Sequence, residues 1–389
     1  MAIQSLRREV PASGEEAAAA LEEAAAAEAA VGFAGAGTKA SWGNAAPEPG
    51  VELSTEGLDG LLEHNEGDFT AILQAGLPLA EAQRAFAAAD QMLALDPPLG
   101  EDEAATVGGV FATADSGPLR HRYGAPRDLI VGATLALADG SVAHAGGKVI
   151  KNVAGYDLAK LFTGAFGTLG LIVDVSVRLH PAPEARATTI ASAEDADALG
   201  RAAAALAHSP LETESLDVRW SAGSGAVLAR YGGAAAQDQA RAALDVMGEA
   251  GADAELVEDD DAPWGEQRTR QRAAEGAAVV KVSGLQARLP DVLRATERAG
   301  ASMVGRAAHG VSWIALPAAE PDELVDAVAK LRAELDPFPC VVLDAPDALR
   351  RAVDVFGEDD PARLALSRRL KERFDPAGAC NPGRFVGGI

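Results

Sequence analysis

The chain opens with a pattern typical of a helix, a strand and a glycine-rich loop, in that order. Residues 14–30 are Glu and Ala with a single Leu after the opening Gly, which favours a helix. VGFAG at residues 31–35 is apolar and favours a strand, and further glycines follow it directly. The sequence therefore predicts a helix, then a strand, then a glycine-rich loop.

Short strands and one helix are predicted over the next 150 residues. Residues 51–79 indicate strands separated by Gly and Pro, and residues 78–93 have a Pro start and apolar positions at helical spacing. From Asp128 an Asp-Gly turn joins two β-type runs, which is typical of a tight hairpin. The run at residues 169–181 predicts a further strand that ends on Pro.

The pattern changes after Pro183. Strand-like residues 279–285 and 312–317 alternate with helical residues 291–300 and 322–335, which predicts a second, α/β lobe. A terminal helix precedes the tail DPAGACNPGRF, which is too rich in turn-forming residues for a frayed end. We expect this tail to dock back on the first lobe.

Size and charge narrow the class of protein. A chain of 389 residues exceeds what one hydrophobic core usually supports, so two domains are expected. The net charge of −24 and the lack of a Lys/Arg-rich block argue against nucleic acid as a partner. No apolar run reaches the ~20 residues of a membrane-spanning helix, and no signal peptide is evident. These patterns predict a cytoplasmic protein.

Cysteine and histidine usage argues against metal chemistry. Cys340 and Cys380 form neither a disulfide framework nor the clustered thiolates of an iron–sulfur centre. The six histidines have no i, i+2 or i, i+4 pair that would place two imidazoles on one metal. We therefore predict no metal site, and expect any electron relay beyond a cofactor to lie in another chain.

Three glycine-bearing segments carry the candidate chemistry. In GAGTKASWG (35–43), glycines let backbone N–H groups approach a pyrophosphate, and Thr38 and Lys39 add a hydroxyl and a charge. The extended, Pro-broken sequence that follows excludes a Rossmann loop. In residues 95–124, small and hydroxyl residues leave room for a planar ring. For the first segment alone a plain strand-to-strand turn is the commoner explanation, and the second is equally compatible with a loop between strands.

The third segment, residues 146–181, contains KNVAGYDL and GTLGLI. Together, the three segments, the RYGAPRDLIVG strand and the terminal FDPAGACNPGRF resemble the vanillyl-alcohol oxidase and PCMH-type FAD-binding superfamily. KNVAGYDL is especially similar to the small, FAD-binding subunit of bacterial glycolate oxidase. The resemblance covers residues 15–186 and 360–389.

The resemblance implies an α+β, two-lobed fold. It consists of a PCMH-type FAD-binding domain (1–186), an inserted α/β cap or substrate domain (187–345), and a C-terminal helix and tail (346–389) that pack back on the FAD domain. Non-covalent FAD is implied, because neither His nor Cys occurs in residues 33–43 or 106–117, where covalent family members attach flavin.

The resemblance also implies which residues contact FAD. Those expected on the pyrophosphate, ribityl and flavin path or near the adenine are Gly35, Ala36, Gly37, Thr38, Lys39, Pro97, Thr106, Gly108, Gly109, Thr113, Gly117, Asn152, Gly155, Tyr156, Gly170, Ile172 and Asn381. For Asn381, a plain Asn-Pro-Gly turn is an equal alternative.

The catalytic group is less defined. Oxidation of a 2-hydroxy acid needs a base and a cation for the carboxylate. His309 in AAHGVSWIALP is the candidate base, although a packed or solvent-facing His is an alternative. The cation candidates are Arg120, Arg122, Arg127, Lys151, Arg306 and Arg384. The segment around Trp264, Gln267, Arg268 and Arg270 resembles a cap segment that faces the flavin, and a capped helix start is its alternative.

The leading hypothesis is the FAD-binding subunit of a glycolate oxidase-like complex that converts glycolate or a similar 2-hydroxy acid to the 2-oxo acid. Its implied partners are a larger FAD-linked catalytic subunit and an iron–sulfur subunit, which would provide any membrane association. A free-standing FAD-linked 2-hydroxy-acid dehydrogenase and a non-catalytic flavin-binding scaffold are the alternatives.

Overall fold

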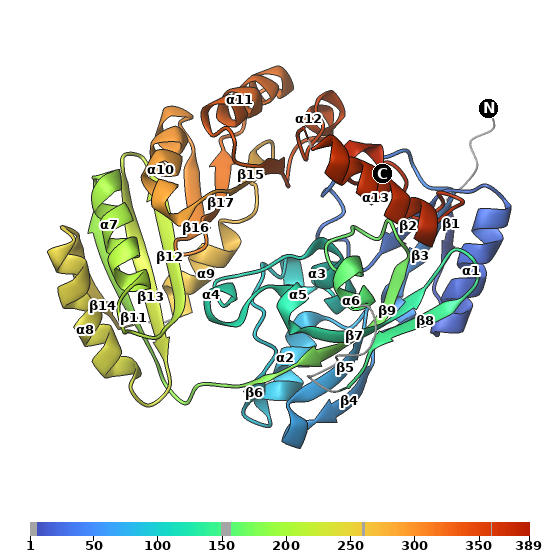
Figure 1. Cartoon of the computed structure of the whole chain (residues 1–389), viewed down its shortest axis with the longest axis horizontal. Helices are drawn as coiled ribbons and strands as arrows, with labels where there is room; N and C mark the ends of the chain where they lie inside the picture. Colours follow the sequence, from blue (N-terminus) through green and yellow to red (C-terminus); the bar gives the residue numbers. More distant parts are fainter. Residues whose placement is uncertain (1–5, 149–156, 259–260, 359) are drawn as a thin grey trace. The chain divides into compact units, whose positions relative to one another are not determined.

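The computed structural model describes residues 6–148, 157–258, 261–358 and 360–389 (Figure 1). The chain divides into two compact units. Unit 1 consists of residues 1–116, 124–182 and 358–389, and unit 2 of residues 117–123 and 183–357. The chain therefore starts in unit 1, builds unit 2 and returns to unit 1 at its C-terminal end.

Two segments fall outside the boundaries expected from sequence. Residues 117–123 belong to unit 2, because their helix contacts a strand of that unit and His121 Nε2 lies 2.7 Å from Thr213 Oγ1. Residues 346–357 also stay with unit 2, because Leu349 and Val355 are buried in its core. The return to unit 1 thus begins at residue 358, later than the sequence suggests.

Unit 1 contains a parallel and an antiparallel sheet. The parallel sheet has the order β1 (Arg7–Glu9), β3 (Val51–Ser54), β2 (Val31–Ala34). The antiparallel sheet has the order β4 (Leu61–Asn65), β5 (Thr70–Gln74), β9 (Leu171–Arg178), β7 (Ile130–Ala136), β8 (Val142–Gly146), and β6 (Gln91–Met92) pairs with β10 (His180–Pro181). Its helices are α1 (Gly14–Ala26), α2 (Leu79–Ala87), α3 (Val107–Thr113), α5 (Pro126–Leu129), α6 (Leu158–Phe162) and α13 (Pro361–Phe374).

Helix α1 shows how local sequence sets this unit. Ser13 caps it by accepting a hydrogen bond from the Glu16 N–H at 3.2 Å. Its alanines and Leu21 form a buried stripe in one cluster with residues of β2, β3 and β9. Cys380, from the tail, is buried in the same cluster, so the end of the chain completes the core that its beginning starts.

Unit 2 is built on an eight-stranded sheet whose neighbours all pair antiparallel. The order is β14 (Asp253–Val257), β11 (Arg186–Ala193), β13 (Ser224–Gly232), β12 (Thr213–Ser221), β16 (Ser302–Arg306), β17 (Val311–Leu316), β15 (Ala278–Ser283), β18 (Cys340–Val342). The helices are α4 (Arg120–Tyr123), α7 (Ala196–Ala207), α8 (Ala236–Glu249), α9 (Asp261–Thr269), α10 (Leu289–Arg298), α11 (Pro321–Glu334) and α12 (Asp347–Ala352).

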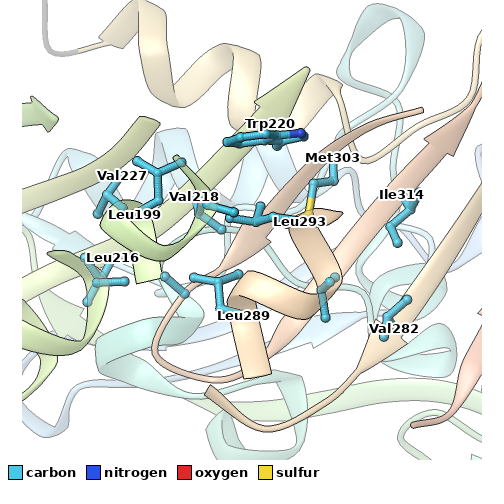
Figure 2. Packing of buried hydrophobic residues seen from close by; sticks show 14 of the residues in the cluster. Leu199, Leu216, Val218, Trp220, Val227, Val282, Leu289, Leu293, Met303 and Ile314 are labelled. Carbon is cyan, nitrogen blue, oxygen red and sulfur yellow. The ribbon is translucent and has the colours of Figure 1, made fainter. Parts of the chain in front are cut away.

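The two faces of this sheet differ in chemistry. Along β12, Leu216, Val218 and Trp220 enter a large apolar core with residues of α7 and α10, as Figure 2 shows. Side chains alternate along a strand, so the residues between them, Asp217 and Arg219, lie on the opposite face. One face therefore carries the large core, and the other carries buried polar groups such as Asp217 beside a smaller apolar cluster around Trp264.

Candidate functional site

Unit 1 contains a cavity of about 300 Å³ whose wall comes from distant parts of the sequence. Its lining consists of residues 32–40 after β2, Pro49, Glu52 and Thr55, Ala75, residues of the segment 106–113, Phe162, residues of the segment 166–172, and Asn381 and Arg384 of the tail. Most of these residues are small or apolar, so backbone amides and flat walls dominate the surface. A cavity of this kind suits a planar ring joined to a polar chain.

Glycines allow two loops of the cavity to touch. A Cβ placed on Gly35 would lie 2.4 Å from Thr106 Oγ1, and one on Gly108 would lie 2.6 Å from the Ala75 Cβ. Both distances are shorter than real Cβ contacts permit, so only glycine fits at either position. Thr106 also caps α3, since its Oγ1 accepts a hydrogen bond from the Gly109 N–H at 3.3 Å.

The C-terminal tail closes the cavity against β2. The Asn381 N–H donates to the Val31 carbonyl at 2.8 Å. Its side-chain Oδ1 accepts from the Phe33 N–H at 3.3 Å, while its Nδ2 donates to the Phe166 carbonyl at 2.8 Å. Asn381 therefore joins three stretches of backbone, and its positive φ of 39° is one that Asn tolerates better than most residues.

A buried ion pair stands beside the first glycine loop. Lys39, which lines the cavity, has its Nζ 3.4 Å from Asp115 Oδ2, and the two side chains are only 5% and 2% exposed. The same Nζ lies 5.9 Å from the centre of the Trp42 ring. Asp115 is held in turn through its Oδ1, which accepts from the Ser116 N–H at 2.9 Å. The charge of Lys39 is thus fixed in place by its own chain.

The cavity brings together most of the residues predicted to contact FAD. Those on its wall are Gly35, Ala36, Gly37, Thr38, Lys39, Thr106, Gly108, Gly109, Thr113, Gly170, Ile172 and Asn381. Among the other predicted residues, Pro97 is buried away from this wall and Gly117 belongs to unit 2. Asn152, Gly155 and Tyr156, together with the cation candidate Lys151, lie outside the described residues.

Sequence reasoning missed several wall residues, chiefly Phe33, Phe162, Phe166, Pro49 and Glu52. The phenylalanines look like ordinary core residues in sequence, and Glu52 looks like a surface position on a strand. No local signal separates them from such roles, because their place on the wall depends on how the loops fold together. Arg384, predicted as a cation candidate, also lies on the wall, where its Nε donates to the Trp42 carbonyl at 3.0 Å.

The polar face of the unit 2 sheet centres on Arg306. This guanidinium is fully buried, with Nη1 2.6 Å from Asp217 Oδ2 and Nη2 2.7 Å from Gln271 Oε1. Gln267 donates to the same Asp217 oxygen at 2.9 Å. Because its charge is already matched by Asp217, Arg306 organises this face rather than offering a free cation to a ligand.

The predicted segment around Trp264 lies in α9, on the same face. The Trp264 Nε1 donates to Thr188 Oγ1 at 2.8 Å, and the Arg230 guanidinium lies 4.9 Å from the centre of its ring. Trp264 and Gln267 are fully buried, so the segment is anchored to the sheet. Its orientation toward a flavin stays a prediction.

Two histidines meet beside this face. The rings of His121, on α4, and His309 are edge to face with centroids 5.4 Å apart. Burial, His309 and Arg122 lower the pKa of His121 to about 4. Partial burial, Arg120 and Arg306 lower the pKa of His309. Both imidazoles are therefore neutral near pH 7, the state in which a histidine can accept a proton.

The remaining cation candidates differ in their surroundings. Arg122 is exposed and forms an ion pair with Glu212 at 3.2 Å, and Arg127 is exposed on α5. Arg120 is half-buried on α4, close enough to His309 to lower the pKa of that ring. Arg120 and His309 thus combine a positive charge and a neutral base on one side of unit 2. Sequence reasoning named both residues but missed His121 as their neighbour.

Within residues 6–148, 157–258, 261–358 and 360–389, no group of three or more His, Cys, Asp or Glu side chains is arranged to hold a metal ion. Over the same ranges, no helix combines the length and the apolar character needed to cross a bilayer.

Two protein families match this chain. Residues 9–146 match the family described as "FAD binding domain", and residues 351–385 match that described as "FAD linked oxidases, C-terminal domain". The first match covers the two glycine loops at residues 35–43 and 106–117. The second covers α13 and the tail that carries Asn381.

Curated relatives match over part of their length. The chain is 36% identical to glycolate oxidase subunit GlcD of Bacillus subtilis, over 42% of this chain and 34% of that protein. It is 34% identical to glycolate oxidase subunit GlcE of Escherichia coli, over 39% of this chain and 42% of that protein. It is 37% identical to a D-lactate dehydrogenase of Archaeoglobus fulgidus, over 44% of this chain and 38% of that protein. The chain thus spans about a third to two-fifths of the length of these relatives.

A solved structure of alkyldihydroxyacetonephosphate synthase superposes with a TM-score of 0.71 at 16% identity, over 96% of this chain and 76% of that one. This likeness confirms the expected α+β, PCMH-type fold. The chain thus contains an FAD-binding domain and the C-terminal domain of FAD-linked oxidases, and FAD is its cofactor.

Proposed function

We propose that this protein oxidises glycolate or a similar small 2-hydroxy acid to the 2-oxo acid with FAD. The observation that carries the proposal is the single cavity formed by the two glycine loops, the 166–172 segment and the tail. The named activities of the glycolate oxidase and D-lactate dehydrogenase relatives favour this substrate class.

The residues of the cavity fit FAD. The backbone amides of residues 35–39 and the buried charge of Lys39 would hold the pyrophosphate, and Thr106, Gly108, Gly109 and Thr113 would line the path to the ring. When bound, FAD supplies the acceptor for the hydride of the substrate. Non-covalent binding is favoured, because neither His nor Cys occurs in residues 33–43 or 106–117.

Residues of unit 2 would handle the substrate. Arg120 would bind the carboxylate, and His309, which is exposed and neutral, would accept the proton of the hydroxyl group. His121 packs against the His309 ring and is held through Thr213, so it would limit the rotation of the base. Arg306 would keep the surrounding strands in register through Asp217.

A role as one subunit of a larger complex is the favoured form of this proposal. Cys340 lies in unit 2 and Cys380 in unit 1, and both are buried, so these two thiols cannot build an iron–sulfur cluster. Electrons leaving the flavin by such a route would need an iron–sulfur subunit, beside a larger FAD-linked catalytic subunit. We place the protein in the cytoplasm, with any membrane association supplied by these partners.

The test starts with the purified chain. A flavin absorbance spectrum, and FAD released by acid, are expected. Glycolate and D-lactate are then assayed with an artificial electron acceptor, alone and after reconstitution with the partner subunits. Bleaching of the flavin by either acid supports the proposal, and strong turnover by the isolated chain favours the free-standing dehydrogenase. A flavin that is never reduced in the working complex leaves only a scaffold role.

A further inference from the structure

Helix α13 has a charge opposite to that of the chain. Its sequence, PARLALSRRLKERF, holds five basic residues and one acidic residue, Glu372, whereas the whole protein has a net charge of −24. A run of arginines in such an acidic chain would ordinarily be neutralised by its own carboxylates. Which face of α13 these residues occupy therefore decides what they do.

The inner face of α13 is firmly attached to unit 1. Lys371 Nζ donates to the carbonyls of Thr168 and Cys380 at 2.8 and 2.7 Å and pairs with Asp375 at 2.5 Å. The Phe374 ring packs edge to face on Phe162, with centroids 5.3 Å apart. These contacts fix the rotation of α13, which Figure 1 labels near the C-terminus, against unit 1.

The outer face combines arginines with one large apolar side chain. Arg368, Arg369 and Arg373 are exposed, and Leu366, two residues before the first of them, is 51% exposed. Within the described part of the chain, no ion pair reaches these three arginines. Helical spacing places all four side chains within one half of the helix surface. We call Leu366, Arg368, Arg369 and Arg373 the outer patch.

Several exposed arginines elsewhere are paired, whereas Arg127 and Arg178 are also exposed without an ion pair among the described residues. Arg201 lies 3.9 Å from Asp195, Arg241 lies 3.2 Å from Asp238, and Arg288 pairs with Asp291. These residues are as accessible as those of the outer patch but are matched by carboxylates of the same chain. Glu372 lies on the same half of α13, but no ion pair among the described residues joins it to these arginines, so the outer patch is a local excess of positive charge.

We infer that the outer patch docks onto a carboxylate-rich surface of another polypeptide. Arginine is enriched in protein interfaces, and unmatched charge next to an apolar side chain gives both steering and a packing anchor. A single large apolar residue is too little for the broad apolar face of a membrane-surface helix. The overall charge of −24 disfavours a nucleic acid. The inference does not depend on the reaction proposed above.

The test uses fluorescently labelled poly-L-glutamate as the acidic polypeptide, with the full-length flavin-loaded protein. Fluorescence anisotropy is measured in low and in physiological salt. We expect binding that weakens with salt and falls about tenfold in the triple variant Arg368→Gln, Arg369→Gln, Arg373→Gln. Leu366→Ser, tested with a Glu/Leu copolymer, is expected to weaken binding about threefold.

The matched control removes the same charge elsewhere. The triple variant Arg201→Gln, Arg241→Gln, Arg288→Gln should bind poly-L-glutamate as the wild type does. Equal loss in both triple variants, or no binding by the wild type, overturns the inference. Arginine-dependent binding to phosphatidylglycerol vesicles without binding to poly-L-glutamate also overturns it, in favour of a lipid surface. Circular dichroism and flavin content confirm that each variant is folded.

Discussion

The cavity of unit 1 and the polar sheet face of unit 2 are built in opposite ways. The cavity is made by what its residues lack: glycines and small side chains leave backbone amides exposed to a ligand. The polar face is made by long charged side chains, such as Arg306, that are held by other side chains far away in sequence. A cofactor site of the first kind can be recognised from local spacing, whereas a site of the second kind depends on the tertiary fold.

The largest expected effect tests the glycine loops. Gly35→Val would drive a side chain into Thr106, since even a Cβ would lie 2.4 Å from its Oγ1. We expect flavin content to fall below about a tenth of the wild-type value, because the loop can no longer pack against α3. Flavin absorbance per protein measures this. Gly67→Ala, whose Cβ would meet nothing within 4 Å, should keep its full flavin. A flavin-replete Gly35→Val protein would rule out the loop as part of the site.

The second effect tests the polar face. If His309 accepts the hydroxyl proton, His309→Asn should lower turnover of the 2-hydroxy acid about 10²- to 10⁴-fold with flavin content unchanged. Stopped-flow bleaching of the flavin by substrate isolates this step. His208→Gln, an exposed histidine at the end of α7, is the matched control. Full activity in His309→Asn would remove this residue from the mechanism.

A third effect separates charge from backbone in the cavity. Asp115→Asn leaves Lys39 buried without its carboxylate partner, so the flavin-free protein should lose about 3 kcal/mol in free energy of unfolding. FAD should restore more stability to the variant than to the wild type, because the pyrophosphate supplies a negative partner. Urea unfolding with and without FAD tests this. Equal stabilisation by FAD in both proteins would mean that Lys39 does not face the pyrophosphate. Adding Lys39→Met should recover stability without FAD.

A fourth effect concerns pH. The folded protein holds the pKa of His121 at about 4, through burial, His309 and Arg122, whereas the unfolded chain titrates near 6.5. Between these values the unfolded state binds the extra proton. Stability from this residue is therefore complete above pH 6.5 and is lost as pH falls toward 4, by at most about 3 kcal/mol. In urea titrations, His121→Gln should lose less stability over this window than the wild type, and identical slopes would contradict this account.

The smallest effect tests the tail. Asn381→Ala removes the side-chain bonds to the Phe33 N–H and the Phe166 carbonyl, which should cost about 2 kcal/mol of unfolding free energy. FAD affinity should fall as well, since the same side chain lines the cavity. Thermal unfolding and flavin titration measure the two effects. The control is Asn65→Ala, which removes an amide that donates to the nearby Glu63 carboxylate at 3.4 Å. This variant should change neither the unfolding free energy nor the FAD affinity.

Local patterns predicted much of the first unit. The hairpin of β7 and β8 follows from its Asp-Gly turn, and α1 from the Glu- and Ala-rich composition of residues 14–30. The glycines at 35, 37, 108 and 109 were identifiable because steric freedom is a property of one residue. These features needed no knowledge of long-range contacts.

Long-range contacts explain what could not be predicted. The pairing of His121 with His309 joins residues of α4 and the turn after β16, and nothing near either residue in sequence signals the other. The assignment of residues 117–123 to unit 2 depends on β12, nearly a hundred positions later. Phe33 and Phe166 reached the cavity wall for the same reason. Contacts between residues far apart in sequence produce no local pattern from which they could be predicted.

The contact between β2 and the C-terminal tail determines when the edge of β2 can be covered during synthesis. Asn381 lies 348 positions after Phe33, yet it covers the free edge of the strand that carries Phe33. On the ribosome, that edge stays open until residue 381 has emerged, and open strand edges invite pairing with other nascent chains. Flavin capture must follow synthesis of this segment rather than accompany it. We therefore expect FAD to load slowly when the chain is expressed rapidly.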